Sequence, residues 1–164
     1  MNQGTHYEKA FEAFMSQRRV PNLSINQARR ALLEGERLKS FDFMIQPAGR
    51  AHILCDVKGR KFPFASWRRS GLGDSWVTAE DVEGLQSWQR IFGRDYQAVF
   101  IFAYWLYDIP ETLESAPLPG TFRFHERWYH FRVVELNAYR LAMRRRSVSW
   151  KTVFVPRRIF QYIA

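Results

Sequence analysis

Apolar side chains near the start of the chain recur at the spacing of an α-helix. Between residues 5 and 18 they occupy one helical face, at Tyr7, Phe11, Phe14 and Met15. Thr5, followed three residues later by Glu8, matches the capping box with which many helices begin. This pattern predicts a helix over residues 5–18.

A second helix is predicted over residues 78–93. Its apolar face is formed by Val82, Leu85, Trp88 and Phe92. Thr78 is a suitable N-cap, acidic residues follow in the first turn where the helix dipole favours them, and Gly93 ends the helix.

Short apolar runs predict the strands. Three of them precede the second helix, at residues 20–25, 41–45 and 52–58, and a long aromatic-rich run at 97–107 follows it. Residues 27–34 predict one or two helical turns. The resulting order of helices and strands predicts an α/β (α+β) fold with a mixed central β-sheet flanked by helices.

The rest of the chain is expected to extend the same sheet. The predicted elements are a connector at 110–120, a hairpin formed by 121–124 and 128–136, a helix with a basic end at 137–146, a strand at 153–155 and a terminal helix at 157–164. Residues 62–76 mix Pro, Gly, Ser, Arg and Trp without a period and predict an exposed loop. We expect a single domain over residues 1–164, with a core at about 5–107 and a C-terminal β-hairpin and helix extension at about 110–164.

Composition favours a folded intracellular protein. Forty-six per cent of the residues are hydrophobic and 16% are aromatic, so a proper core can form. Cys55 is the single cysteine, which leaves no disulfide within one chain and favours a reducing compartment. The N-terminus lacks a signal-peptide pattern, and the longest apolar run is about half of a membrane span. These features predict a cytoplasmic protein without a membrane partner.

The charge points to nucleic acid. The net charge is +9, and only five of the 25 basic residues are lysines. Arginine suits bidentate contacts with phosphate, and the arginines cluster at 18–19, 29–30, 68–69, 144–146 and 157–158. A generically basic, solvated surface is the alternative.

Two acidic residues and one lysine stand out among the apolar runs. Asp56 and Lys58 end one predicted strand and project to the same face, since alternate strand residues share a side. If the run containing Asp42 pairs beside it, two carboxylates and an amine meet. Such a set can hold a divalent cation and activate a water for phosphodiester cleavage. The alternative is an ordinary edge ion pair between Asp56 and Lys58, with Asp42 facing solvent.

This order of elements, with Asp42 in the second strand and Asp56-Val57-Lys58 in the third, resembles the PD-(D/E)XK (restriction-endonuclease-like) nuclease superfamily. It is most similar to compact Holliday junction resolvase-type nucleases. The resemblance covers residues 5–107 and implies an αβββαβ core. It also implies that Asp42, Asp56 and the Val57 carbonyl bind Mg²⁺ or Mn²⁺, and that Lys58 orients or helps to deprotonate the attacking water.

Further roles follow from the resemblance. Many members add a glutamate from the first helix, for which Glu8 is the natural candidate; a purely capping role with Thr5 is the alternative. A polar residue of the second helix, Gln86 or Gln89, could also serve.

Basic residues are expected to hold the nucleic acid. Arg60 and Lys61 are expected in a flexible turn, beginning at Gly59, that grips phosphates beside the site. The other expected contacts are Arg68, Arg69, Arg144, Arg145 and Arg146. Trp67, Trp76, Trp128 and Trp150 could stack on bases or belong to the core.

The sequence therefore predicts a metal-dependent DNA nuclease that selects structure or ends rather than sequence. DNA is favoured over RNA, and junction-cleaving relatives commonly act as homodimers. One alternative is a nuclease fold that binds nucleic acid without turnover. Another is a protein-interaction domain that uses the aromatic C-terminal hairpin.

Overall fold

The computed structural model describes residues 5–25, 32–33, 36–37, 39–70 and 75–162. In chain order the elements are α1 (His6–Gln17), β1 (Asn22–Ser24), β2 (Leu32–Leu33), β3 (Glu36–Arg37), β4 (Phe43–Ile45), β5 (His52–Pro63), α2 (Phe64–Ser70), β6 (Val77–Thr78), α3 (Ala79–Phe92), β7 (Tyr96–Tyr107), α4 (Glu111–Glu114), β8 (Phe122–Phe124), β9 (Arg127–Glu135), α5 (Leu136–Ala142), β10 (Arg144–Ser147), β11 (Thr152–Phe154), the 3₁₀ helix η1 (Arg157–Ile159) and β12 (Gln161–Tyr162).

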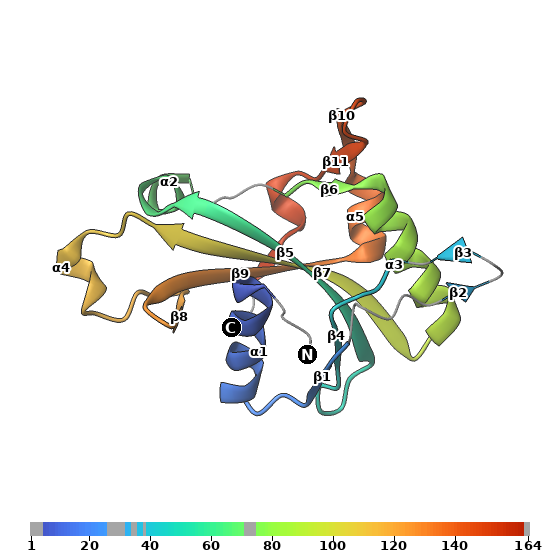
Figure 1. The fold of residues 1–164 in the computed structure, drawn as a ribbon, viewed down its shortest axis with the longest axis horizontal. Helices are drawn as coiled ribbons and strands as arrows, with labels where there is room; N and C mark the ends of the chain where they lie inside the picture. Colours follow the sequence, from blue (N-terminus) through green and yellow to red (C-terminus); the bar gives the residue numbers. More distant parts are fainter. Residues whose placement is uncertain (1–4, 26–31, 34–35, 38, 71–74, 163–164) are drawn as a thin grey trace.

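A mixed sheet forms the centre of the molecule (Figure 1). Its strand order is β1-β4-β5-β7-β9-β12, and β8 pairs with β9. The long strands β5 and β7 run parallel over their whole length, and the other neighbours in this sheet are antiparallel. A smaller sheet, β10-β11-β6, stands beside it. The predicted fold class, a mixed sheet flanked by helices, is confirmed.

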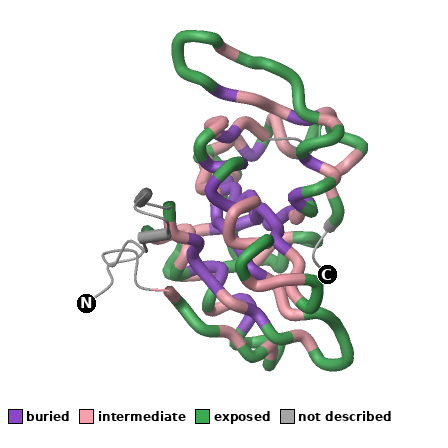
Figure 2. Tube along the Cα trace, turned by 90° about the vertical axis from the view of Figure 1, so that its right-hand side faces the viewer, coloured by how far each residue is buried: buried purple, intermediate pink, exposed green. Residues whose placement is uncertain are grey.

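Helices cover both faces of this sheet, α1 on one side and α3 with α5 on the other (Figure 1). Side chains of β5 and β7 alternate between the two faces. Cys55 and Val57 pack with α1, whereas Leu54 and Phe100 pack on the side of α3 and α5. Buried residues consequently run through the middle of the chain trace (Figure 2). None of the helices in the described ranges has the length and apolar character needed to cross a bilayer.

The two strongest helix predictions are confirmed together with their caps. The Thr5 hydroxyl accepts a hydrogen bond from the Glu8 amide at the start of α1. At the start of α3, Thr78 Oγ1 accepts from the Asp81 amide at 3.1 Å, and Asp81 Oδ2 accepts from the Thr78 amide at 2.9 Å. Gly93 ends α3 with a φ of 87°, which favours glycine.

Several weaker predictions are wrong. The expected loop at 62–76 contains α2, anchored by the buried Phe64. The helix expected at 137–146 ends at Ala142, because Arg144 and Arg145 pair with β11 instead. The terminal helix expected at 157–164 is replaced by η1 and by β12, which pairs with β9.

Two other expectations concern short segments. The connector at 110–120 includes the one-turn helix α4. Most of the helical turns expected at 27–34 lie outside the described residues, and Leu32–Leu33 form the strand β2, paired with β3.

Gly59 lies inside β5, so the expected flexible turn at 59–61 is wrong. Parallel pairing with β7 continues through Gly59 to Pro63, and the ring of Tyr7 fills the space above the glycine. A Cβ at position 59 would lie 2.2 Å from Tyr7 Cδ2. Glycine at position 59 therefore allows α1 to approach β5 closely at Tyr7. Glu8 follows Tyr7 in α1 and is brought near the same strand.

Replacing Gly59 with alanine should destabilise the protein by about 1–3 kcal/mol, the usual cost of overpacking. Urea denaturation measures this free energy of unfolding. In a Tyr7→Ala background the same substitution should cost less than about 1 kcal/mol, because the clashing ring is gone. An equal cost in both backgrounds would contradict this account of the contact.

Candidate active site

The ladder between β4 and β5 ends next to the predicted acids. β4 pairs with β5 over Phe43–Ile45, and the amide of Asp42, the residue just before β4, donates to the Cys55 carbonyl at 2.9 Å. Continuing this register places Asp42 opposite Asp56. The end of this ladder leaves a space beside β5, whose pairing with β7 is not interrupted.

A cavity of about 250 Å³ occupies this point. Its lining residues are Glu8, Lys39, Ser40, Asp42, Asp56, Val57 and Lys58. The structure thus brings together five of the residues that were predicted to act on metal or water, namely Glu8, Asp42, Asp56, Val57 and Lys58. They come from α1, from the segment before β4 and from β5.

Asp42 points inward. Its side chain is held by the Val57 amide, which donates to Oδ2 at 2.6 Å, and only 5% of the residue is exposed. The solvent-facing Asp42 of the alternative interpretation is therefore not observed. The other half of that interpretation is present, because Lys58 Nζ lies 3.1 Å from Asp56 Oδ2.

The acids at this site resist ionisation. Burial raises the pKa of Asp42, and the neighbouring Asp56 carboxylate raises it further. Burial also raises the pKa of Asp56, with Lys58 opposing the shift and Asp81 adding to it. Burial raises the pKa of Glu8, and Asp56 contributes in the same direction. Crowded carboxylates with raised pKa values are typical of functional sites.

Lys58 is held between two carboxylates. Its Nζ lies 3.1 Å from Asp56 Oδ2 and 2.9 Å from Asp81 Oδ1. Burial alone would lower the pKa of this ammonium, but Asp56 and Asp81 outweigh it and the net pKa is raised. Lys58 therefore carries its positive charge at the edge of the cavity.

Asp81 was not predicted to take part in the site. Its side chain accepts a hydrogen bond from the Thr78 amide at the start of α3, and it also pairs with Lys58 and Lys39. Burial opposes ionisation of Asp81, yet these partners together hold its pKa well below the usual range. The sequence signal was its place in the first turn of α3, but nothing local showed that this turn reaches β5.

Glu8 both contacts Thr5 and faces the cavity, so the structure is compatible with either of the roles that the sequence left open. Thr5 Oγ1 donates to Glu8 Oε1 at 3.2 Å, while the same side chain lines the cavity. The two glutamines of α3 lie elsewhere. The Gln89 side chain hydrogen-bonds backbone groups of Gly93, Tyr96 and Ala98, and Gln86 faces Arg140.

The predicted nucleic-acid contacts lie in four places: on the two faces of β5, on α2 and on β10. Arg60 lies on the same face of β5 as Lys58, with its guanidinium 4.2 Å from the centre of the Trp76 ring. Lys61 faces the other side of β5, over Trp105 and Tyr107. The remaining predicted contacts are exposed on α2 (Arg68 and Arg69) and on β10 (Arg144, Arg145 and Arg146).

The donor set fits a hard divalent cation. Asp42 and Asp56 offer carboxylate oxygens, and Mg²⁺ is commonly bound by one or two carboxylates while it keeps several waters. Among the described residues, no three His, Cys, Asp or Glu side chains form a complete cluster of ligands. Protein ligation would therefore rest on the two aspartates and the predicted Val57 carbonyl.

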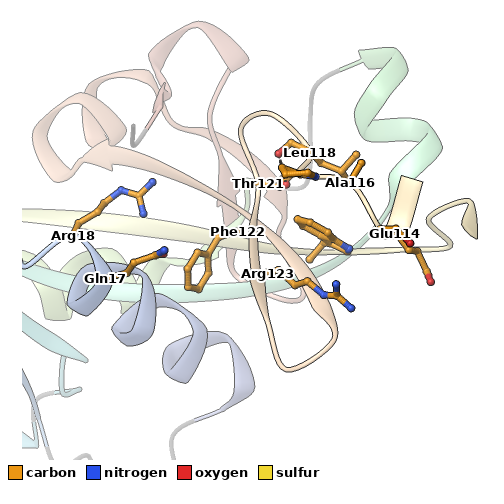
Figure 3. Close-up of a pocket in the computed structure, with 11 residues that line it drawn as sticks. Gln17, Arg18, Glu114, Ala116, Leu118, Thr121, Phe122 and Arg123 are labelled. Atoms are coloured by element: carbon orange, nitrogen blue, oxygen red, sulfur yellow. Dashed lines mark hydrogen bonds between the residues drawn. The ribbon is translucent and has the colours of Figure 1, made fainter. Parts of the chain in front are cut away.

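A second cavity, of about 800 Å³, lies between the end of α1 and the segment that joins α4 to β8 (Figure 3). Gln17 and Arg18 border it on one side, and Glu114 and Arg123 on another. Glu114 is the single carboxylate in its lining. It lacks the paired acids that the chemistry requires.

The fold is similar to that of a solved Holliday junction resolvase from the archaeal hyperthermophile Archaeoglobus fulgidus. The TM-score is 0.51 at 15% sequence identity, over 95% of this chain and 90% of the other. No protein-family model matches this chain, and no curated protein matches it. At this identity the likeness shows the fold: a resolvase-type mixed sheet flanked by helices.

The raised pKa of Asp42 predicts how stability depends on pH. The folded protein keeps the proton on this carboxyl to a higher pH than the unfolded chain does, so its metal-free stability falls as the pH rises above about 4. Asp42→Asn removes this penalty and retains an acceptor for the Val57 amide. In chelator at pH 7 it should raise the melting temperature, by about 2–4 °C for each kcal/mol relieved.

The gain should shrink as the pH is lowered towards 4, where the wild-type carboxyl is also protonated. Thermal melts of both proteins across pH 4–8 measure it. A constant gain, or a loss at pH 7, would show that ionisation of Asp42 does not burden the fold.

Proposed function

We propose that this protein is a metal-dependent nuclease that hydrolyses phosphodiester bonds in DNA. The observation that carries the proposal is the pair of buried aspartates, Asp42 and Asp56, facing one cavity with Lys58 beside them. A structural ion pair needs one acid for one base. Burying Asp42 beside the Asp56–Lys58 pair adds an unfavourable free energy. A cation bound between the two acids during function would offset it.

Each residue then has a distinct task. Asp42 and Asp56 would hold Mg²⁺ or Mn²⁺, with the Val57 carbonyl as a further ligand. An ion held there would supply Lewis-acid chemistry, polarising the scissile phosphate and lowering the pKa of a water. Lys58, kept charged by Asp56 and Asp81, donates hydrogen bonds that orient the attacking water and offsets charge on the phosphate. This charge favours an orienting role for Lys58 over that of a general base.

The preference for DNA structure or ends over sequence is also part of the proposal. Exposed arginines on α2 and β10 suit contacts with the phosphate backbone, which do not read bases. The fold shared with a junction resolvase supports branched DNA as a substrate. A homodimer is the arrangement that paired cuts in such a substrate would require.

Asp56→Ala should abolish Mg²⁺- or Mn²⁺-dependent cleavage of branched DNA, with a loss of about 10³-fold or more. Lewis-acid stabilisation by a metal is worth several kcal/mol, and each 1.4 kcal/mol changes the rate tenfold. The rate is measured in single-turnover assays on branched, single-stranded and linear duplex DNA. Asp95→Ala, at an exposed acid before β7, is the matched control and should cut normally.

The same assays separate the alternatives. If wild type and Asp56→Ala both bind DNA, neither cuts it, and the variant binds more tightly, the fold serves as a binding module. If neither protein binds DNA, the nuclease proposal fails and the protein-interaction interpretation takes its place.

Asp81→Asn should slow cleavage by about 10- to 100-fold, the usual effect of removing a partner that orients a group in the site. Lys58 would keep Asp56 but lose its second carboxylate. The pH–rate profile should change as well, because the pKa of Lys58 would fall towards its ordinary value. A uniform loss with an unchanged profile would instead indicate that Asp81 acts only by capping α3.

A further inference from the structure

The hairpin formed by β10 and β11 projects beyond the helices (Figure 1), and its first strand and its turn are mostly exposed, at the top of Figure 2. Its turn carries large apolar side chains in contact with solvent: Val148 is 71% exposed and Trp150 is 78% exposed. Among the described residues, Trp150 is the one aromatic side chain in the set of large hydrophobic residues that are exposed. Such a side chain at a projecting tip is typical of a contact surface.

The sequence of the hairpin itself is cationic. Arg144, Arg145 and Arg146 precede the turn and Lys151 ends it, and no Asp or Glu occurs in the sequence after Glu135. A basic surface around an exposed indole suits nucleic acid, whose phosphates meet the cations and whose bases can stack on the ring.

The hairpin is fixed in place by its neighbours. β11 pairs with β6, and the Tyr139 hydroxyl donates to the carbonyls of Ser75 and Val153. Thr152, two residues after Trp150, is buried. A rigid base of this kind presents Trp150 at a defined position.

Its turn is linked to the candidate active site through the first turn of α3. The Lys151 carbonyl accepts a hydrogen bond of 2.8 Å from the amide of Ala79, the first residue of α3. Two residues further along α3, Asp81 pairs with Lys58. The hairpin turn and the catalytic lysine are therefore connected through a single helical turn.

Basic side chains also lie close to one another on β5 and on the hairpin. Lys58 and Arg60 share a face of β5. The Arg60 guanidinium lies 4.2 Å from the centre of the Trp76 ring, and that of Arg146, on β10, lies 5.3 Å from it. Arg60 on β5 and Arg146 on the hairpin therefore contact the same indole ring.

We propose that the hairpin Arg144–Phe154 binds DNA next to the cleavage site, and that Trp150 stacks on a base exposed at a break in the duplex. This inference rests on the proposed nuclease function and specifies its substrate. In an uninterrupted duplex both faces of every base are covered. An indole at a fixed position finds a free base face at a branch, a gap or an unpaired end, so the hairpin makes the enzyme selective for such DNA.

The test is equilibrium binding in chelator, where no cleavage occurs. Fluorescence anisotropy compares a forked DNA with unpaired arms against a long linear duplex, for wild type, Trp150→Ala and Trp150→Phe. Trp150→Ala should bind the fork about tenfold more weakly, within the range measured for base–aromatic stacking, and the duplex unchanged. Trp150→Phe should recover most of the loss. Leu23→Ala, at an apolar residue that is 61% exposed on β1, is the control and should bind both DNAs as wild type does.

A Trp150→Ala variant with unchanged affinity for the fork, or with equal losses on fork and duplex, would overturn the proposal. Circular dichroism verifies that the exposed substitution leaves the fold intact. Cleavage assays with Asp56→Ala keep the two proposals separate. If wild type cuts but fork selectivity does not depend on Trp150, the hairpin proposal alone fails. If selectivity depends on Trp150 but no metal supports cutting, the hairpin proposal stands and the nuclease function fails.

Discussion

The candidate active site is built around two carboxylates, those of Asp42 and Asp56, which lie side by side where the pairing of β4 with β5 ends. Two carboxylates at this depth are costly, because burial and mutual repulsion both disfavour their charged forms. The Val57 amide and the Lys58 ammonium compensate part of that cost. The remaining excess of acid is what a divalent cation would neutralise. The site therefore destabilises the fold when no metal is bound, and a metal-binding function explains why such a cost is kept.

Helices on both faces of the sheet, α1 and α3, contribute side chains to this site. On one side, the contact between Tyr7 and Gly59 brings α1 close enough for Glu8 to line the cavity. On the other, Asp81 caps α3 and grips Lys58 with the same side chain. Between them, β5 pairs with β7 without interruption from His52 to Pro63 and so holds the acid-bearing part of the strand in the sheet.

Strong local patterns were sufficient for much of this arrangement. The amphipathic faces and caps of α1 and α3, and the alternation that puts Asp56 and Lys58 on one face, can all be seen in short stretches of sequence. What could not be predicted depends on distant partners. Residues 144–147 form a strand because β11 is beside them, and residues 161–162 do so because β9 has a free edge. Gly59 resembled a turn glycine because Tyr7, which packs on it, lies far away in the sequence. The second role of Asp81 was hidden for the same reason.

The most direct test of the central claim is calorimetric titration of the protein with Mn²⁺ in buffers of different protonation enthalpy. Buried carboxyls with raised pKa values must release protons when a cation binds. We predict one site, proton release that grows as the pH is lowered, and loss of binding in Asp56→Asn. Binding that persists unchanged in Asp56→Asn, or no binding to the wild-type protein, would contradict the assignment of this site to a metal.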